Sequence, residues 1–348
     1  MKVQSVTGPL SRNELGVTSP HEHVFIDISA FYLPREIKDF DNSENVEVAI
    51  DNLGVLNRDP YALKDNLKMT DFEIQQKELS WFKLSGGKTI VDATTKGIGR
   101  DPEALKKISE NTGINIIAGA GYYVYSTHPE ELEKMSLDEI ADTIVKEVEE
   151  GLDGTNIKAG IIGEIGISEV FNENERRVLR ASAIAQKKTG VGINVHINPW
   201  TVNGIEAADI LLSEGVSPDK ICISHIDVEG NIDYIHTLLD KGVYVEFDNF
   251  GKQYYVDKDA RHDGYGQFIS DVERVRLLKR LIEEGYKKQI LLSCDVCLKT
   301  LLRSYGGWGY DHLLRNIIPV MLEEGIKSED IDLMLIDNPA DFLCGKEE

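Results

Sequence analysis

The sequence predicts an α/β protein built as a single (β/α)8 barrel over residues 1–348, and three observations support this prediction. About eight short apolar runs recur along the chain, enough strands for such a barrel. Most of these runs are preceded by a polar helical pattern that ends at a glycine. No low-complexity segment or Pro/Ser-rich linker divides the 348 residues, a length at which a barrel with insertions is common.

The expected strands are continuously apolar, not alternating, which is typical of parallel strands that are covered on both faces. A doubly wound open sheet has the same periodicity and is the alternative architecture, but we expect the barrel. The eight runs cover residues 18–24, 89–93, 115–119, 159–164, 192–196, 221–225, 243–248 and 290–295.

Helices are expected between these runs. Before the third run, EALKKISENTG stops at Gly113, because glycine adopts the left-handed conformation at a helix end at little cost. Ser136 and Glu139 form a capping box that opens another helix. Residues 28–85 are long for one connection, so we expect an insertion over the barrel mouth with a helix near residues 71–84.

The composition of the chain excludes some classes of partner and indicates a cellular compartment. The chain has 60 acidic and 38 basic residues, a net charge of −22, which argues against nucleic acid or an anionic membrane as a partner. No apolar run approaches the roughly 18 residues of a spanning helix, and the first residues lack a signal-peptide pattern. Four cysteines form no disulfide framework. We therefore expect a cytoplasmic protein with a small-molecule substrate.

Metal-ligating residue types stand at the ends of five of the expected strands. Residues two apart in a strand point to the same side, so both histidines of the first run can face the barrel interior. Catalytic groups of such barrels project from the carboxyl ends of the strands. The candidate metal ligands are His21, His23, Glu164, His196, His225 and Asp295.

Four imidazoles and two carboxylates suit two divalent ions. Zinc is the metal expected first, with manganese or cobalt as alternatives. Because six ligands serve two ions, a carboxylate is expected to bridge them, and the ions would share a nucleophilic hydroxide. Asp295 is the expected catalytic base. A single histidine at a strand end is more often structural, but packing alone does not explain five such strand ends.

The chain resembles the phosphotriesterase-related family of the amidohydrolase superfamily, which are binuclear metal hydrolases on a (β/α)8 barrel. The resemblance extends from about Gly16 to Phe342 and is nearest to the branch of the animal phosphotriesterase-related proteins. The segments that carry it are PHEH (20–23), TTKGIGRDP (94–102), AGAGYYV (118–124), KAGIIGEIG (158–166), VHIN (195–198), SHID (224–227), EFDNFGK (246–252), LLSCD (291–295) and GGWGYDHLL (306–314).

The resemblance implies a ligand set for each ion. The buried ion would be held by His21, His23, Glu164 and Asp295, and the more exposed ion by Glu164, His196 and His225. Organophosphate-degrading members of the family bridge the ions with a carboxylated lysine. This chain has Glu164 there, so phosphotriesterase activity does not transfer directly from the family name.

Two further residues are expected to bind substrate. Tyr123 follows the third run and Lys252 the seventh, where an ammonium could meet an anionic substrate group; rim packing is the alternative for Tyr123. Arg274 and Arg276 are read as exposed charges at a helix start, with anion contact as the alternative. Cys294 and Cys297 match a CxxC pattern but follow a strand, unlike a redox pair that opens a helix.

The expected function is hydrolysis of a lactone or carboxylic ester. An N-acyl amide, of the N-acyl amino acid type, is the first alternative, and phosphotriester cleavage would be a side activity. A barrel that binds ligand without catalysis is the alternative from another class, although all six ligand positions carry metal-competent residues. A homodimer is an expectation from the family resemblance.

Overall fold

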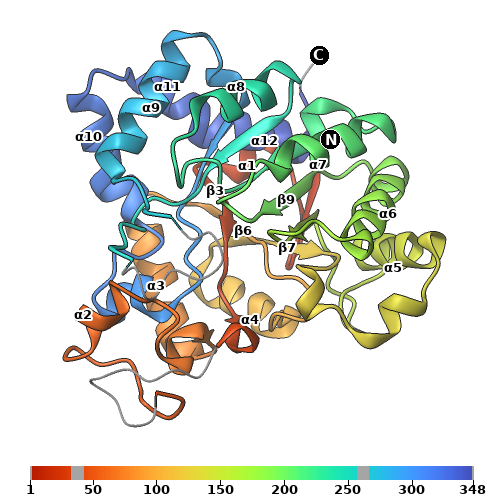
Figure 1. Cartoon of the computed structure of the whole chain (residues 1–348), viewed down its shortest axis with the longest axis horizontal. Coiled ribbons are helices and arrows are strands. Elements are labelled where there is room, and N and C mark those ends of the chain that lie inside the picture. Colours follow the sequence, from red (N-terminus) through yellow and green to blue (C-terminus); the bar gives the residue numbers. More distant parts are fainter. Residues whose placement is uncertain (1, 33–42, 257–265, 347–348) are drawn as a thin grey trace.

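The computed structural model describes residues 2–32, 43–256 and 266–346, and its central feature is a sheet of eight parallel strands. Their order, β12-β11-β10-β9-β8-β7-β6-β3, follows the sequence around the sheet, which confirms the predicted α/β barrel (Figure 1). The strands are β3 (Thr18–Glu22), β6 (Thr89–Asp92), β7 (Asn115–Ala120), β8 (Ile161–Ile167), β9 (Ile193–Ile197), β10 (Ile221–Ile223), β11 (Tyr244–Phe247) and β12 (Ile290–Leu292).

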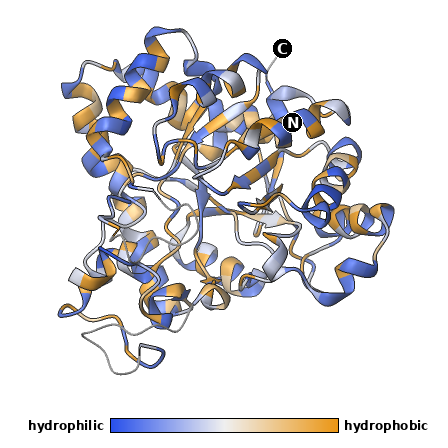
Figure 2. Cartoon of the chain, viewed as in Figure 1, coloured by the Kyte–Doolittle hydropathy of each residue, from blue (hydrophilic) through white to orange (hydrophobic). Residues whose placement is uncertain are grey.

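Helices surround the strands, and in Figure 2 they carry both hydrophobic and hydrophilic residues, as expected for elements with one buried face. Ser136 caps α5 in the predicted capping box with Glu139. No described helix is both long and apolar enough to cross a membrane. The helices are α1 (Arg12–Leu15), α2 (Leu53–Leu56), α3 (Phe72–Leu84), α4 (Pro102–Thr112), α5 (Leu137–Glu149), α6 (Glu173–Thr189), α7 (Asn203–Ser213), α8 (Ile232–Asp240), α9 (Asp271–Glu283), α10 (Ile318–Glu323), α11 (Ser328–Asp332) and α12 (Asn338–Cys344).

The buried apolar residues form separate clusters on the two sides of the strands. The larger cluster fills the space between the strands and the helices. A smaller cluster takes one residue from each of six strands and adds residues from the N-terminal segment and α12, which close one end of the barrel. Its members include Val3, Leu15, Val91, Ile117, Ile161, Cys222, Tyr244, Leu291 and Phe342.

Glu22 joins the first strand to the last. Its carboxylate is fully buried and accepts hydrogen bonds from the backbone N–H groups of Cys294, at 3.0 Å, and Val296, at 2.8 Å. A backbone hydrogen bond from Asp295 N to His21 O, at 3.3 Å, lies beside them. The junction between β3 and the segment after β12, which closes the barrel and is called the seam here, is therefore held largely by the side chain of Glu22.

Several strands end earlier than the apolar runs predict. β10 ends at Ile223 and β12 at Leu292, and the residues that follow leave the sheet. His225 and Asp295 have φ values of +61° and +45°, in the left-handed region that non-glycine residues seldom adopt. These turns redirect the chain where the candidate ligands stand, and surrounding contacts must hold such a conformation.

The described part of the expected insertion contributes two helices, α2 and α3, and one strand of a small two-stranded sheet. β4 (Ile26–Asp27) pairs antiparallel with β5 (Lys68–Met69), and α3 matches the helix predicted near residues 71–84. The remaining strands, β1 (Val3–Ser5) and β2 (Gly8–Leu10), form an N-terminal hairpin. Residues 33–42 of the expected insertion lie outside the described residues.

Replacing Glu22 by alanine is expected to destabilise the metal-free protein by about 3 kcal/mol, because two buried backbone N–H groups lose their acceptor. Urea unfolding followed by circular dichroism measures the change. Glu110→Ala, at an exposed position in α4, is the matched control and should change stability by less than about 0.5 kcal/mol. Equal stability of the two variants would contradict the role of Glu22 in the seam.

Candidate metal centre

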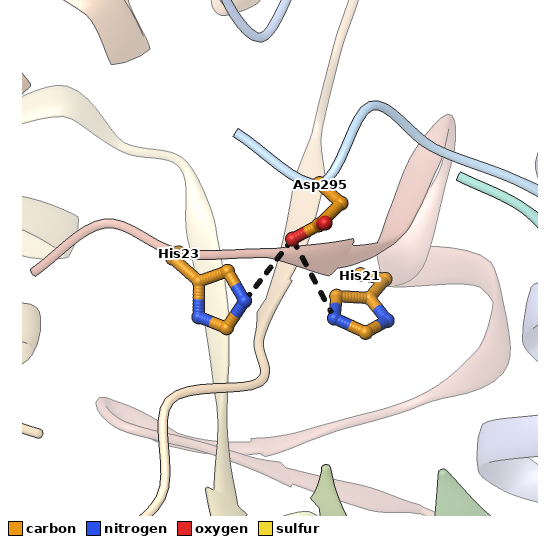
Figure 3. A group of neighbouring side chains, drawn as sticks. All are labelled: His21, His23 and Asp295. Atoms are coloured by element: carbon orange, nitrogen blue, oxygen red, sulfur yellow. Dashed lines mark ion pairs between the residues drawn. The ribbon is translucent and has the colours of Figure 1, made fainter. Parts of the chain in front are cut away.

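The carboxyl ends of the strands bring all six predicted ligands into one cluster. Figure 3 shows the imidazoles of His21 and His23 facing the carboxylate of Asp295. The Nε2 atoms of these histidines lie 3.8 and 3.2 Å from Asp295 Oδ1. The alternation expected for residues two apart therefore places both histidines on the interior side.

Glu164 lies between two groups of candidate ligands. Its Oε1 is 3.3 Å from His23 Nε2, and its Oε2 is 3.4 Å from His21 Nε2 and 3.2 Å from His196 Nδ1. His225 Nε2 lies 3.8 Å from the same Oε2. A carboxylate in this position can serve both groups, as the sequence predicts for the bridging ligand.

The residues present fit divalent ions. One potential ligand atom from each of His21, His23 and Asp295 lies within 4.8 Å of the other two, and the same holds for Glu164, His196 and His225. His21 Nε2 and Glu164 Oε2 are buried and make no hydrogen bond with any described residue. Buried polar atoms normally have a partner. These two atoms face each other, and imidazole and carboxylate are ligands that zinc and similar metals accept.

Charge interactions within the cluster oppose the effect of burial. Burial alone would raise the pKa of Glu164, but His21, His196 and His225 hold it well below its usual range. Burial lowers the pKa of His225, yet Asp248 and Glu164 raise it to about 10. The surroundings therefore favour the ionised form of Glu164, the form in which a carboxylate binds a cation.

Two carboxylates of β11 and the residue after it orient the histidines, and the sequence reasoning did not single them out. Asp248 Oδ1 is 3.0 Å from His225 Nδ1 and also accepts from the backbone N–H of His225. Glu246 Oε2 is 3.5 Å from His21 Nδ1. Such partners fix the tautomer and direction of a ligating imidazole. Charged residues two apart in an otherwise apolar run were the available signal.

Lys252 is almost fully buried and forms an ion pair with Asp295, the expected catalytic base. Burial opposes the charge of this lysine, but Asp295 raises its pKa above the ordinary value. The backbone carbonyl of Lys252 accepts a hydrogen bond from Arg274 at 3.1 Å. Arg274 therefore fixes the backbone of the loop that carries the Lys252 ammonium.

The prediction that Arg274 is an exposed charge is wrong. Arg274 is fully buried and pairs with Asp227 at 3.0 Å and with Asp271 at 2.9 Å. Arg276 is exposed, as expected, and pairs with Glu324. The helical pattern of this segment indicated a helix but not which face the remaining barrel loops would cover.

A cavity of about 380 Å³ opens beside the ligands. Tyr123, the first predicted substrate-binding residue, lines it and places its hydroxyl 3.2 Å from a ring nitrogen of His196. Lys252, the second, lines it as well. The other lining residues include Ile26, Ile28, Phe31, Asp59, Tyr61, Ile167, Glu169, Tyr254, Val256, Phe268, Cys297 and Leu298.

Comparison with known proteins identifies the family. Residues 1–343 match the model of the phosphotriesterase family. The chain is 37% identical to an N-acetyltaurine hydrolase of Xenopus tropicalis over 99% of this chain and 98% of that protein. A crystal structure of a resiniferatoxin-binding protein from Rhodobacter sphaeroides superposes with a TM-score of 0.94 and 34% identity, covering 98% and 94% of the two chains.

A lactonase from Listeria monocytogenes has a TM-score of 0.79 and 26% identity, with both chains fully covered. The matched family and the hydrolase relatives make this protein a hydrolase of the phosphotriesterase-like group. The barrel, the candidate ligands at the strand ends and the match across nearly the whole sequence agree: the chain belongs to the phosphotriesterase family.

Proposed function

We propose that this protein is a metal-dependent amidohydrolase that cleaves N-acyl derivatives of small anionic amines. The observation that carries the proposal is the position of Lys252, whose ammonium lies in the cavity beside the candidate ligands. Among the described residues that line the cavity, it is the only lysine or arginine. Its ammonium lies next to Asp295, at the edge of the ligand cluster.

A lysine ammonium has three N–H donors. One of them contacts Asp295 here, so the others are able to hold a carboxylate or sulfonate of the substrate at the same time. This pairing would orient the amine half of an N-acyl amino acid or N-acyl amino sulfonate against the ligand cluster. The similarity to N-acetyltaurine hydrolases supports the same substrate class.

The residues proposed to hold two ions are those that meet around Glu164. His21, His23 and Asp295 form one set with Glu164, and His196 and His225 form the other. When bound, divalent ions of this kind supply an acidified water molecule and polarise the scissile carbonyl. Zinc, manganese or cobalt suits the donor set.

The side chains of the protein transfer the proton of the attacking water and orient the reacting groups. Asp295 accepts a proton from the attacking water and delivers it to the leaving nitrogen as the C–N bond breaks and the new C–O bond forms. Lys252 keeps Asp295 ionised and directs it. The Tyr123 hydroxyl, beside His196, bounds the opposite side of the reacting carbonyl.

Lactone or ester hydrolysis is the second candidate function. The similarity to the lactonase from Listeria monocytogenes favours it, since the identity is 26% over the full length. Esters and amides are cleaved at the same carbonyl, but an amide nitrogen needs a proton to leave. A panel of N-acyl amino acids, N-acyl taurines, lactones and phosphotriesters, assayed at equal enzyme concentration, separates the candidates.

Metal content tests the ligand assignment. The wild-type protein loaded with zinc is expected to hold about two equivalents per chain. Glu164→Ala should hold one or fewer, because both groups of ligands lose the shared carboxylate. Elemental analysis after gel filtration measures this. Glu169→Ala, which removes an exposed carboxylate at the cavity, is the control and should retain both. Two equivalents in Glu164→Ala would reject the assignment.

Substituting Asp295→Asn is expected to lower kcat by about 10²–10⁴-fold, because the amide does not transfer the proton. The Oδ1 atom that faces His23 is kept, so metal content should remain near that of the wild type. Steady-state kinetics combined with elemental analysis checks both quantities. Turnover equal to that of the wild type would exclude Asp295 as the base.

Lys252→Met is expected to raise KM for an N-acyl taurine by about tenfold to a hundredfold, the value of a charge-assisted hydrogen bond. The neutral N-acyl ethylamine with the same acyl chain should be affected much less, and Lys252→Arg should restore part of the loss. If both substrates lose activity equally, Lys252 acts only through Asp295 and not on the substrate anion.

A further inference from the structure

We propose that the cavity selects substrates whose acyl chain is longer than acetyl, a medium-length saturated chain, and binds it along a wall formed by Tyr123 and Phe31. This inference rests on the proposed amidohydrolase function for its chemistry. The size and the apolar lining of the cavity support it independently of that function.

The cavity is larger than an acetylated amine requires. Its volume of about 380 Å³ lies within the range of about 300–1,000 Å³ that encloses drug-sized ligands. An acetyl group adds only two carbons beyond the amine. Most of the lining that does not belong to the ligand cluster is aliphatic or aromatic. A longer apolar chain would use this surface, and a short one would leave it in contact with water.

The residues proposed to contact the two halves of the substrate follow opposite strands of the barrel. Tyr123 follows β7 and Lys252 follows β11, which are separated by four places in the order of the eight-stranded barrel. Positions four apart in a ring of eight strands face each other across its axis. If Lys252 holds the amine half of a substrate, the acyl half is directed toward Tyr123.

Contacts continue outward from Tyr123. Its ring packs edge-on against His196, with centroids 4.6 Å apart, and edge-on against Phe31, with centroids 6.3 Å apart. Ile26 and Ile28 also line the cavity from the segment that carries Phe31, and both are buried. The wall therefore extends from a candidate ligand to apolar side chains, and no described residue along it is a lysine or an arginine.

The expected gain in affinity follows from the area removed from water. Each buried methylene contributes about 0.8 kcal/mol, which corresponds to about fourfold in affinity. Lengthening the chain by two methylenes should therefore strengthen binding by about 15-fold until the wall is covered. Further lengthening should give no gain.

Binding of straight-chain carboxylates tests the wall without any reaction. Acetate, butanoate, hexanoate and octanoate are titrated into the zinc-loaded protein by calorimetry. The dissociation constant is expected to fall by about fourfold per methylene. A dissociation constant that is independent of chain length, or that is lowest for acetate, overturns the proposal.

The same series of N-acyl taurines is then assayed for turnover, with kcat/KM expected to rise in parallel with carboxylate affinity. If long carboxylates bind tightly but no N-acyl taurine is cleaved, the apolar wall stands and the proposed function fails. If acetyl taurine is the best substrate and carboxylate affinity is flat, the function stands and the wall is rejected.

Phe31→Ala localises the effect. Removing this ring is expected to weaken octanoate binding by about tenfold, with a much smaller effect on acetate. Tyr255→Ala removes an exposed aromatic ring that does not line the cavity and is the matched control, expected to bind every carboxylate as the wild type does. If both variants bind octanoate equally well, the acyl chain does not contact Phe31. Thermal unfolding confirms that both variants are folded.

Discussion

The imidazole of His21 lies among four carboxylates, and the arrangement of the carboxyl end of the barrel depends on this contact. The nearest oxygens belong to Glu164 at 3.4 Å, Glu246 at 3.5 Å, Asp248 at 3.6 Å and Asp295 at 3.8 Å. Burying that much negative charge is costly unless positive charge accompanies it. The imidazoles and the buried Lys252 compensate part of this negative charge, and divalent ions bound at the site would compensate the rest.

Within the barrel, the interior is arranged in layers along its axis. Apolar side chains such as Tyr244 and Leu291 fill the end nearest α12. Above them, Glu246 accepts hydrogen bonds from Asn194, Ser224 and Ser293. The candidate ligands come next, and the cavity lies beyond them. The candidate ligands therefore lie directly above a layer whose side chains are held by packing and hydrogen bonds.

Sequence reasoning predicted the barrel because its signals are local. A continuous apolar run followed by a polar residue marks a strand and its carboxyl end, and this pattern identified His196, His225 and Glu164 together with their common location. The topology then required these ends to meet. The fold and the grouping of the candidate ligands therefore follow from local sequence patterns.

The remaining features depend on contacts between distant parts of the chain. The local pattern around Asp248, an acid two residues after Glu246 in an apolar run, does not indicate which group it contacts. Its role follows from a hydrogen bond to His225, which follows another strand. Arg274 lies on a helix that resembles other amphipathic helices, yet it is fully buried and pairs with Asp227 from a separate loop. The positive φ angles at His225 and Asp295 are likewise set by packing.

The separation of Tyr123 and Lys252 across the barrel has a consequence for how the family diversifies. Tyr123 and Lys252 follow strands that are four places apart in the barrel, and substitutions at sites without a shared partner usually contribute additively to binding. With Lys252 on the head group and Tyr123 on the acyl chain, as proposed, substitutions in the loop after β11 would change the preferred head group and leave the acyl preference unchanged. Substitutions in the loop after β7 would do the reverse. A single catalytic cluster between them would serve each new combination without being rebuilt.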